Sequence, residues 1–159
     1  MMIGRQMLFS EGGMPHFGLM EERSLGPVDG PLQRARLHLR GGKRRLRQGK
    51  ISAGIVTLYD AMVAAMEYYV AANRQRMPLS PDENPHSDKV MFRVLVRAGV
   101  LDRQFDFEAF DRLMERALHE DLSGYDYGGL VERIDAVMFR LGVMPFSEES
   151  LPPEDPSTF

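Results

Sequence analysis

Residues 51–72 carry the feature that most constrains the fold, an apolar stripe with helical spacing. Its members lie three or four positions apart and are Ile51, Ile55, Leu58, Met62, Ala65 and Tyr69. That spacing matches the 3.6-residue turn of an α-helix, so we predict one long helix here, with Ser52 as its N-cap. The segment is long enough to cross a bilayer. It contains Asp60 and Glu67, however, and carboxylates inside a membrane are costly, so we expect a buried helix of a soluble bundle and no membrane contact.

Four further segments repeat the helical period, approximately residues 31–47, 87–98, 106–120 and 128–141. Ser87 stands where an N-cap is needed, and Gly99 and Gly142 stand where helices end. No segment shows the two-residue alternation of a half-buried strand. The sequence therefore predicts an all-α protein, an antiparallel bundle of four to five helices.

The pair Gly41-Gly42 leaves two interpretations open for residues 34–50. Arg34 to Arg40 alternate in polarity, and Gly-Gly is a hairpin turn signal. The flanks lack β-branched and aromatic residues, which favours a helix, with a break or kink at the glycines as the alternative.

The two ends of the chain differ from the middle. Residues 1–30 are rich in Gly and Met and hold no period, so we expect an irregular arm. Residues 146–159 are acidic and proline-rich, which predicts a disordered tail. Residues 31–145 remain as a single helical-bundle domain, as a length of 159 residues suggests.

Composition excludes several kinds of chemistry. The chain has no cysteine, which removes disulfides and thiolate sites, and it starts without a signal-peptide pattern, so we expect a cytoplasmic protein. Its four histidines show no paired metal-ligand spacing, and we predict neither a metal nor a cofactor. Asp60 and Glu67 lie on one helix face, where we expect them to pair with arginines of a neighbouring helix rather than bind an ion.

A run of thirty residues from Gly30 to Tyr59 carries eight Lys and Arg and no Asp or Glu, although the whole chain has a formal charge of −3. The candidate anion-binding residues in it are Arg36, Arg40, Lys43, Arg44 and Arg47. Such a face favours a nucleic acid, a nucleotide or an acidic protein as partner. The acidic tail or a second subunit could equally cover it. No aromatic residues interleave the charges, so stacking on single-stranded bases is not indicated.

The order of elements resembles the HEPN superfamily of small prokaryotic helical bundles. The resemblance spans about residues 31–142 and rests on the hairpin 46–61, on Asn84-Pro85-His86-Ser87-Asp88 and on Gly124-Tyr125-Asp126-Tyr127. It implies a homodimer. In ribonuclease members an Arg and a His separated by four to six intervening residues cleave RNA. Arg112 and His119, with six residues between them, match that motif, and the resemblance implies catalytic roles for this pair.

The sequence leaves three function hypotheses. The first is a non-enzymatic binding module that presents its basic face to an anionic partner. The second is a metal-independent ribonuclease in which His119 transfers a proton and Arg112 stabilises the phosphoryl oxyanion. The third is a purely structural oligomer. A solvated helix face, with Glu115 and His119 as a surface pair, is the plain alternative to the ribonuclease reading of helix 106–120.

Overall fold

The structure, a computed structural model, describes residues 22–159, and the prediction of an all-α protein is confirmed there. Five α-helices follow one another, namely α1 (Glu22–Arg47), α2 (Ile51–Ala72), α3 (Asp88–Arg97), α4 (Phe107–His119) and α5 (Gly128–Arg140). Short 3-10 turns are η2 (Arg74–Arg76), η3 (Glu148–Ser150) and η4 (Pro156–Thr158). No strand occurs among the described residues.

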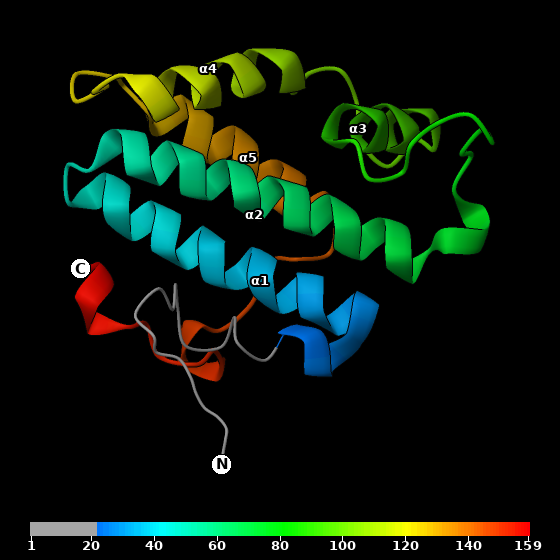
Figure 1. Ribbon diagram of the computed structural model, residues 1–159, viewed down its shortest axis with the longest axis horizontal. Coiled ribbons are helices and arrows are strands. Elements are labelled where there is room, and N and C mark those ends of the chain that lie inside the picture. The colour runs from blue at the N-terminus through cyan, green and yellow to red at the C-terminus, as the bar shows by residue number, and fades with distance from the viewer. Residues whose placement is uncertain (1–21) are drawn as a thin grey trace.

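Helix α2 is the central element of the bundle. It forms an antiparallel hairpin with α1, and its other sides contact α3, α4 and α5 (Figure 1). The predicted stripe is buried from Ile51 to Ala65 and half-buried at Tyr69, and Ile55, Leu58 and Met62 are wholly inaccessible to solvent. By length and composition alone α2 is apolar enough to cross a membrane, a test that core helices of soluble proteins also pass.

Close contact between α1 and α2 depends on two glycines. A Cβ at Gly42 would lie 2.8 Å from the Leu58 side chain, and one at Gly54 would lie 2.7 Å from the Leu46 side chain. Each glycine thus makes room for a leucine of the opposite helix. Helix α1 runs through Gly41 and Gly42 to Arg47. The helical interpretation of this segment is therefore confirmed, and the alternative of a β-hairpin turn at the two glycines is wrong.

Most predicted helix ends agree with the structure. Ser87 Oγ accepts a hydrogen bond from Val90 N, and both Gly99 and Gly142 have positive φ at helix ends. The prediction for Ser52 was wrong, because it lies inside the first turn of α2. Its Oγ donates to the carbonyl of Glu120 and accepts from Leu122 N, which ties the α4–α5 connection to α2.

Helix α1 begins earlier than predicted. The irregular arm was wrong for residues 22–30, which are helical with a kink at Gly26, where φ is 90°. Pro27 follows the kink and so opens a new helical piece, a position that proline tolerates because its missing N–H is not needed there. The rest of the predicted arm, residues 1–21, lies outside the described residues.

An aromatic cluster joins α2, α3 and α4. Phe92 stacks on Phe107 with ring centroids 5.1 Å apart, and Tyr59 packs against Phe107 and Phe110. The Tyr59 hydroxyl lies 3.1 Å from Asp88 Oδ2 and 3.0 Å from Asp111 Oδ1. Burial, followed by the two carboxylates, raises the pKa of Tyr59 above its ordinary value.

Residues 146–159, called the tail below, correct the prediction of disorder. The tail lies against α1 on the side away from α4, below α1 in Figure 1. The alternative in which the acidic tail covers the basic face agrees with the structure, because Arg40 and Arg44 of α1 contact the tail across more than 100 positions of sequence.

Candidate functional site

The basic run of α1 is largely paired within the chain. Arg34 shows the pattern, since its guanidinium contacts Glu22 at 2.8 Å, Asp60 at 3.7 Å and also Glu67. Burial acts to lower the pKa of Arg34, but these carboxylates outweigh it and the pKa is raised. The prediction that Asp60 and Glu67 pair with an arginine of a neighbouring helix is confirmed.

The tail supplies the partners of two more arginines. Arg44 Nε donates to Glu154 Oε1 at 3.0 Å, and Arg40 Nη2 donates to the Pro152 carbonyl at 2.7 Å. Arg40 Nε also lies 3.8 Å from Glu154. The Phe159 ring covers Arg44, with the guanidinium carbon 4.7 Å from its centroid. The tail therefore meets α1 through a carboxylate, a carbonyl and an aromatic ring.

The other candidate anion-binding residues of α1 divide into paired and exposed ones. Arg36 Nε donates to the Val143 carbonyl at 2.9 Å, and Lys43 Nζ lies 2.7 Å from Asp135 Oδ1. Arg47 is exposed at the end of α1. Burial, followed by the nearby charge of Arg44, lowers the pKa of Arg45. Of the five predicted residues, Arg36, Arg40, Lys43 and Arg44 are thus half-buried and engaged within the chain.

A second group of arginines surrounds a hollow between α4 and α5. The hollow has a volume of about 470 Å³. Its cationic lining comes from Arg112 and Arg116 of α4 and Arg133 of α5, joined by the Tyr125 side chain. Its apolar lining is Phe105, Ala109, Phe110, Leu113 and Leu130. We call this site the arginine hollow.

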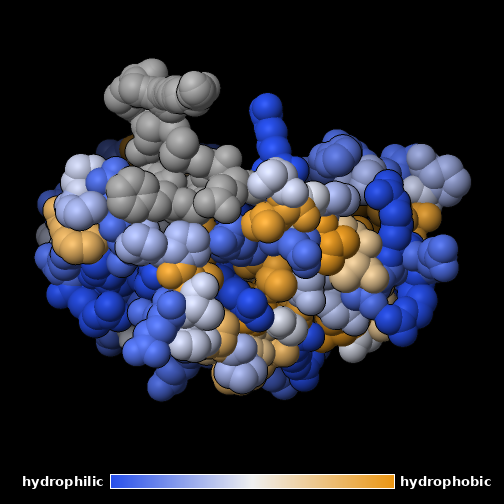
Figure 2. All heavy atoms as spheres, turned by 90° about the horizontal axis from the view of Figure 1, so that it is seen from below, coloured by the Kyte–Doolittle hydropathy of each residue, from blue (hydrophilic) through white to orange (hydrophobic). Residues whose placement is uncertain are grey.

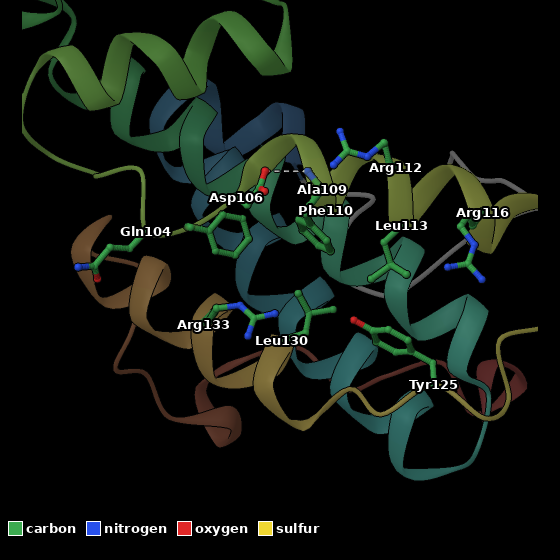
Figure 3. Close-up of a pocket in the computed structure, with 11 residues that line it drawn as sticks. Gln104, Asp106, Ala109, Phe110, Arg112, Leu113, Arg116, Tyr125, Leu130 and Arg133 are labelled. Carbon is green, nitrogen blue, oxygen red and sulfur yellow. Dashed lines mark hydrogen bonds between the residues drawn. The ribbon is translucent and has the colours of Figure 1, made fainter.

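The side chains that line the arginine hollow come from α4, from α5 and from the segments next to these helices. Figure 3 shows Arg116 and Leu113 pointing from α4 towards the side on which Arg133 and the Tyr125 hydroxyl lie, with Arg112 on the upper side of α4. The amphipathic pattern of α4 explains the arrangement. Phe107 and Phe110 lie on the buried face of the helix, and the two arginines lie on its exposed face.

Negative charge is scarce around the arginine hollow. Asp106 is the one acid among its described lining residues, and its carboxylate already accepts the cap hydrogen bond from Ala109 N at 2.9 Å. Arg116 lies 3.4 Å from Glu120 on the exposed helix surface. Within residues 22–159, no carboxylate forms an ion pair with Arg112 or Arg133. Arg112 and Arg133 therefore line this hollow without an ion-pair partner among the described residues.

A neighbouring hollow of about 510 Å³ continues the basic surface and shares Phe105, Asp106 and Arg112 with the first. It adds the cations Lys89, Arg93, Arg97 and Arg103. Arg97 pairs with Glu83, and its guanidinium, together with the Ser80 N–H, lowers the pKa of Glu83 to about 2. The basic surface thus extends along both sides of Phe105.

Arg112 and His119, the catalytic pair that the HEPN resemblance implies, both lie on α4 with exposed side chains. Arg112 lines both hollows, whereas His119 is the last residue of α4 and lines neither. Seven positions along a helix separate their Cα atoms by about 10 Å. The structure thus places Arg112 in the basic surface and His119 beyond its end.

Sequence reasoning missed Arg116, Arg133 and Tyr125. They belong to three separate segments, so they form no run and no recognisable spacing. The available signal was the period of α4, which puts Arg112 and Arg116 one turn apart beside the apolar stripe. Among the described residues, no three His, Asp or Glu side chains cluster so as to hold a metal ion.

Compared with known protein families, curated proteins and solved structures, this chain gives no match in any of the three. The HEPN resemblance therefore stays a prediction, and the functional argument rests on the geometry of the chain itself.

Proposed function

We propose that the protein is a binding module for phosphate esters, with its site in the arginine hollow. The observation that carries the proposal is that Arg112 and Arg133 both line one hollow and form no ion pair with a carboxylate among the described residues. The basic residues of α1 are weaker candidates for binding a phosphate, because Glu154 of the tail and Asp135 of α5 already pair with three of them.

The chemistry of the lining supports phosphate over other anions. A guanidinium presents its N–H groups as a planar fork that matches two phosphate oxygens. Arg116 and Arg133 approach from different helices, and the Tyr125 hydroxyl adds a neutral donor. The apolar lining offers a surface for a base or another non-polar group attached to the phosphate.

The ligand is a phosphate ester that is free as a nucleotide or part of an RNA strand. The adjoining basic hollow favours a ligand with more than one phosphate, since its cations continue the surface beyond Arg112. Binding is expected to weaken as salt rises, because each neutralised phosphate releases counterions.

The experiment is fluorescence anisotropy of a labelled RNA oligonucleotide with the purified 159-residue chain, at low and moderate salt. Competition with inorganic phosphate and with a mononucleotide separates the sources of the phosphate group. Displacement by the mononucleotide at micromolar concentration identifies a nucleotide site, and displacement only by RNA identifies a strand-binding site. Absence of salt-sensitive binding to all three ligands would overturn the proposal.

A second candidate function is RNA cleavage by Arg112 and His119, favoured by the position of Arg112 at the junction of the two hollows. A denaturing gel of the same RNA reads out this activity. Cleavage that His119→Ala abolishes, with binding retained, would support the ribonuclease. An intact RNA in the unaltered protein would retire it and leave the binding module.

A further inference from the structure

We infer that the basic surface of α1 is a docking site for an acidic peptide that carries an aromatic residue, and that the tail occupies it as a built-in ligand. This surface, called the tail site below, consists of Arg36, Arg40, Arg44 and Arg45. It lies away from the arginine hollow, since α2 separates α1 from α4 (Figure 1).

The contacts have the form of a peptide bound to a surface. Glu154 is buried between two guanidiniums, with 14% of its side chain exposed, against 9% for Arg40 and 11% for Arg44. Phe146 receives the guanidinium of Arg36 at 5.4 Å from its ring centroid, as Phe159 receives that of Arg44. Charge and aromatic contact therefore alternate along the tail.

On the α1 side, only side chains make the described polar contacts with the tail. The backbone hydrogen bonds described for the tail are local turns, from Ser150 to Ser147, from Leu151 to Glu148 and from Phe159 to Pro156. Among the described residues, no backbone–backbone hydrogen bond joins the tail to α1. The tail can thus leave while the helical hydrogen bonds of α1 stay intact.

One guanidinium nitrogen of the tail site, Arg45 Nη1, is buried without a hydrogen-bond partner among residues 22–159, beside the Arg44–Glu154 pair. Arg47 and Lys50 stand exposed at the same end of α1. A peptide that places a hydrogen-bond acceptor at Arg45 Nη1 would therefore gain a contact that the tail does not make among the described residues.

Figure 2 shows this side of the molecule with the tail in place, and hydrophilic and hydrophobic residues are interspersed over it. A covalently attached tail has an effective concentration in the millimolar range, so a free peptide competes only when the attached contact is weakened. This competition makes the inference testable.

The test measures the anisotropy of a labelled synthetic peptide of residues 146–159 with three full-length proteins, the unaltered chain, Glu154→Gln and Glu149→Gln. Glu149 is exposed in the same tail, so its variant is the matched control for charge. We expect the peptide to bind Glu154→Gln about tenfold more tightly than the other two. Adding Arg44→Gln to Glu154→Gln should abolish that binding.

Equal affinity of the peptide for all three proteins would overturn the inference, as would equal binding of a peptide that itself carries Gln at position 154. A second measurement needs no variant. Hydrogen exchange of residues 146–159 in the unaltered protein should accelerate as salt rises, before α1 and α2 exchange. Tail and core amides that accelerate together, or a tail that salt leaves unchanged, would also overturn it.

Discussion

Glu154 Oε1 accepts a hydrogen bond from Arg44 Nε at 3.0 Å, across 110 positions of sequence. The pair is shielded by the Phe159 ring and by Arg40, so water reaches it poorly. Electrostatic attraction is stronger in such surroundings than on an open surface. The contact explains why a segment with a disordered composition has a fixed place in the fold.

The first prediction concerns the stability contributed by this pair. Arg44→Gln removes the guanidinium and leaves the buried Glu154 carboxylate without its closest partner. We expect the free energy of unfolding to fall by about 1–3 kcal/mol, as for other buried groups that lose a hydrogen bond. Urea denaturation measures the change. Arg47→Gln is the matched control, because Arg47 is exposed three positions later, and it should change stability by less than about 0.5 kcal/mol.

The second prediction contrasts two adjacent glycines. Gly42→Ala drives a Cβ into Leu58 at 2.8 Å, so we expect a loss of about 1–3 kcal/mol from overpacking. At Gly41 the nearest atom is the flexible end of Arg45, at 3.0 Å, which can shift. Gly41→Ala should therefore keep most of the roughly 1 kcal/mol helix-propensity gain of alanine. Thermal unfolding of both variants checks the opposite signs, and equal losses would contradict the described α1–α2 packing.

The glycine pair also shows what sequence can predict. The helical period of residues 51–72 was decisive, because one side of a long helix must be apolar to be buried. The helix through Gly41-Gly42 followed from the absence of β-branched flanks. The reason why position 42 is a glycine is the close approach of Leu58, and this reason becomes visible only when the position of α2 is known. Local pattern predicts an element, but only tertiary contact explains its exceptions.

Three errors have one cause. The helical turn at residues 22–30, the place of the tail and the role of Ser52 all depend on groups distant in sequence. Glu22 forms an ion pair with Arg34, Glu154 forms one with Arg44, and the Ser52 hydroxyl donates a hydrogen bond to the Glu120 carbonyl. Glycine and proline content describes local preference only, and the acidic composition of the tail allowed contact with the basic face as one alternative without indicating which residues would pair. The arginine hollow was incompletely predicted for the same reason, because Arg133 reaches it from another helix.

The third prediction concerns Tyr59 at the junction of α2, α3 and α4. Because its folded pKa is raised, the neutral phenol stabilises the fold fully below the ordinary tyrosine pKa of about 10, and this contribution is lost as pH rises above it. In the folded protein, Tyr59 should form no phenolate between about pH 9 and 11. The ultraviolet absorbance change in that range should be as large in Tyr59→Phe as in the unaltered chain.

The same variant has a stability readout. Tyr59→Phe keeps the ring but removes the hydroxyl between Asp88 and Asp111, so we expect a loss of about 1 kcal/mol near neutral pH. The difference between the two proteins should shrink above about pH 10. A smaller absorbance change in Tyr59→Phe, with a pH-independent stability difference, would contradict the shared hydroxyl.

The measurement that tests the central claim most directly is the salt dependence of RNA binding in Arg133→Gln and in its control Arg74→Gln. Both changes remove one exposed positive charge, but only Arg133 lines the arginine hollow. We expect Arg133→Gln to weaken binding about tenfold and to lower the slope of log affinity against log salt by about 1, while Arg74→Gln changes neither. Equal effects of the two variants would show that binding follows net charge, and would contradict a phosphate site between α4 and α5.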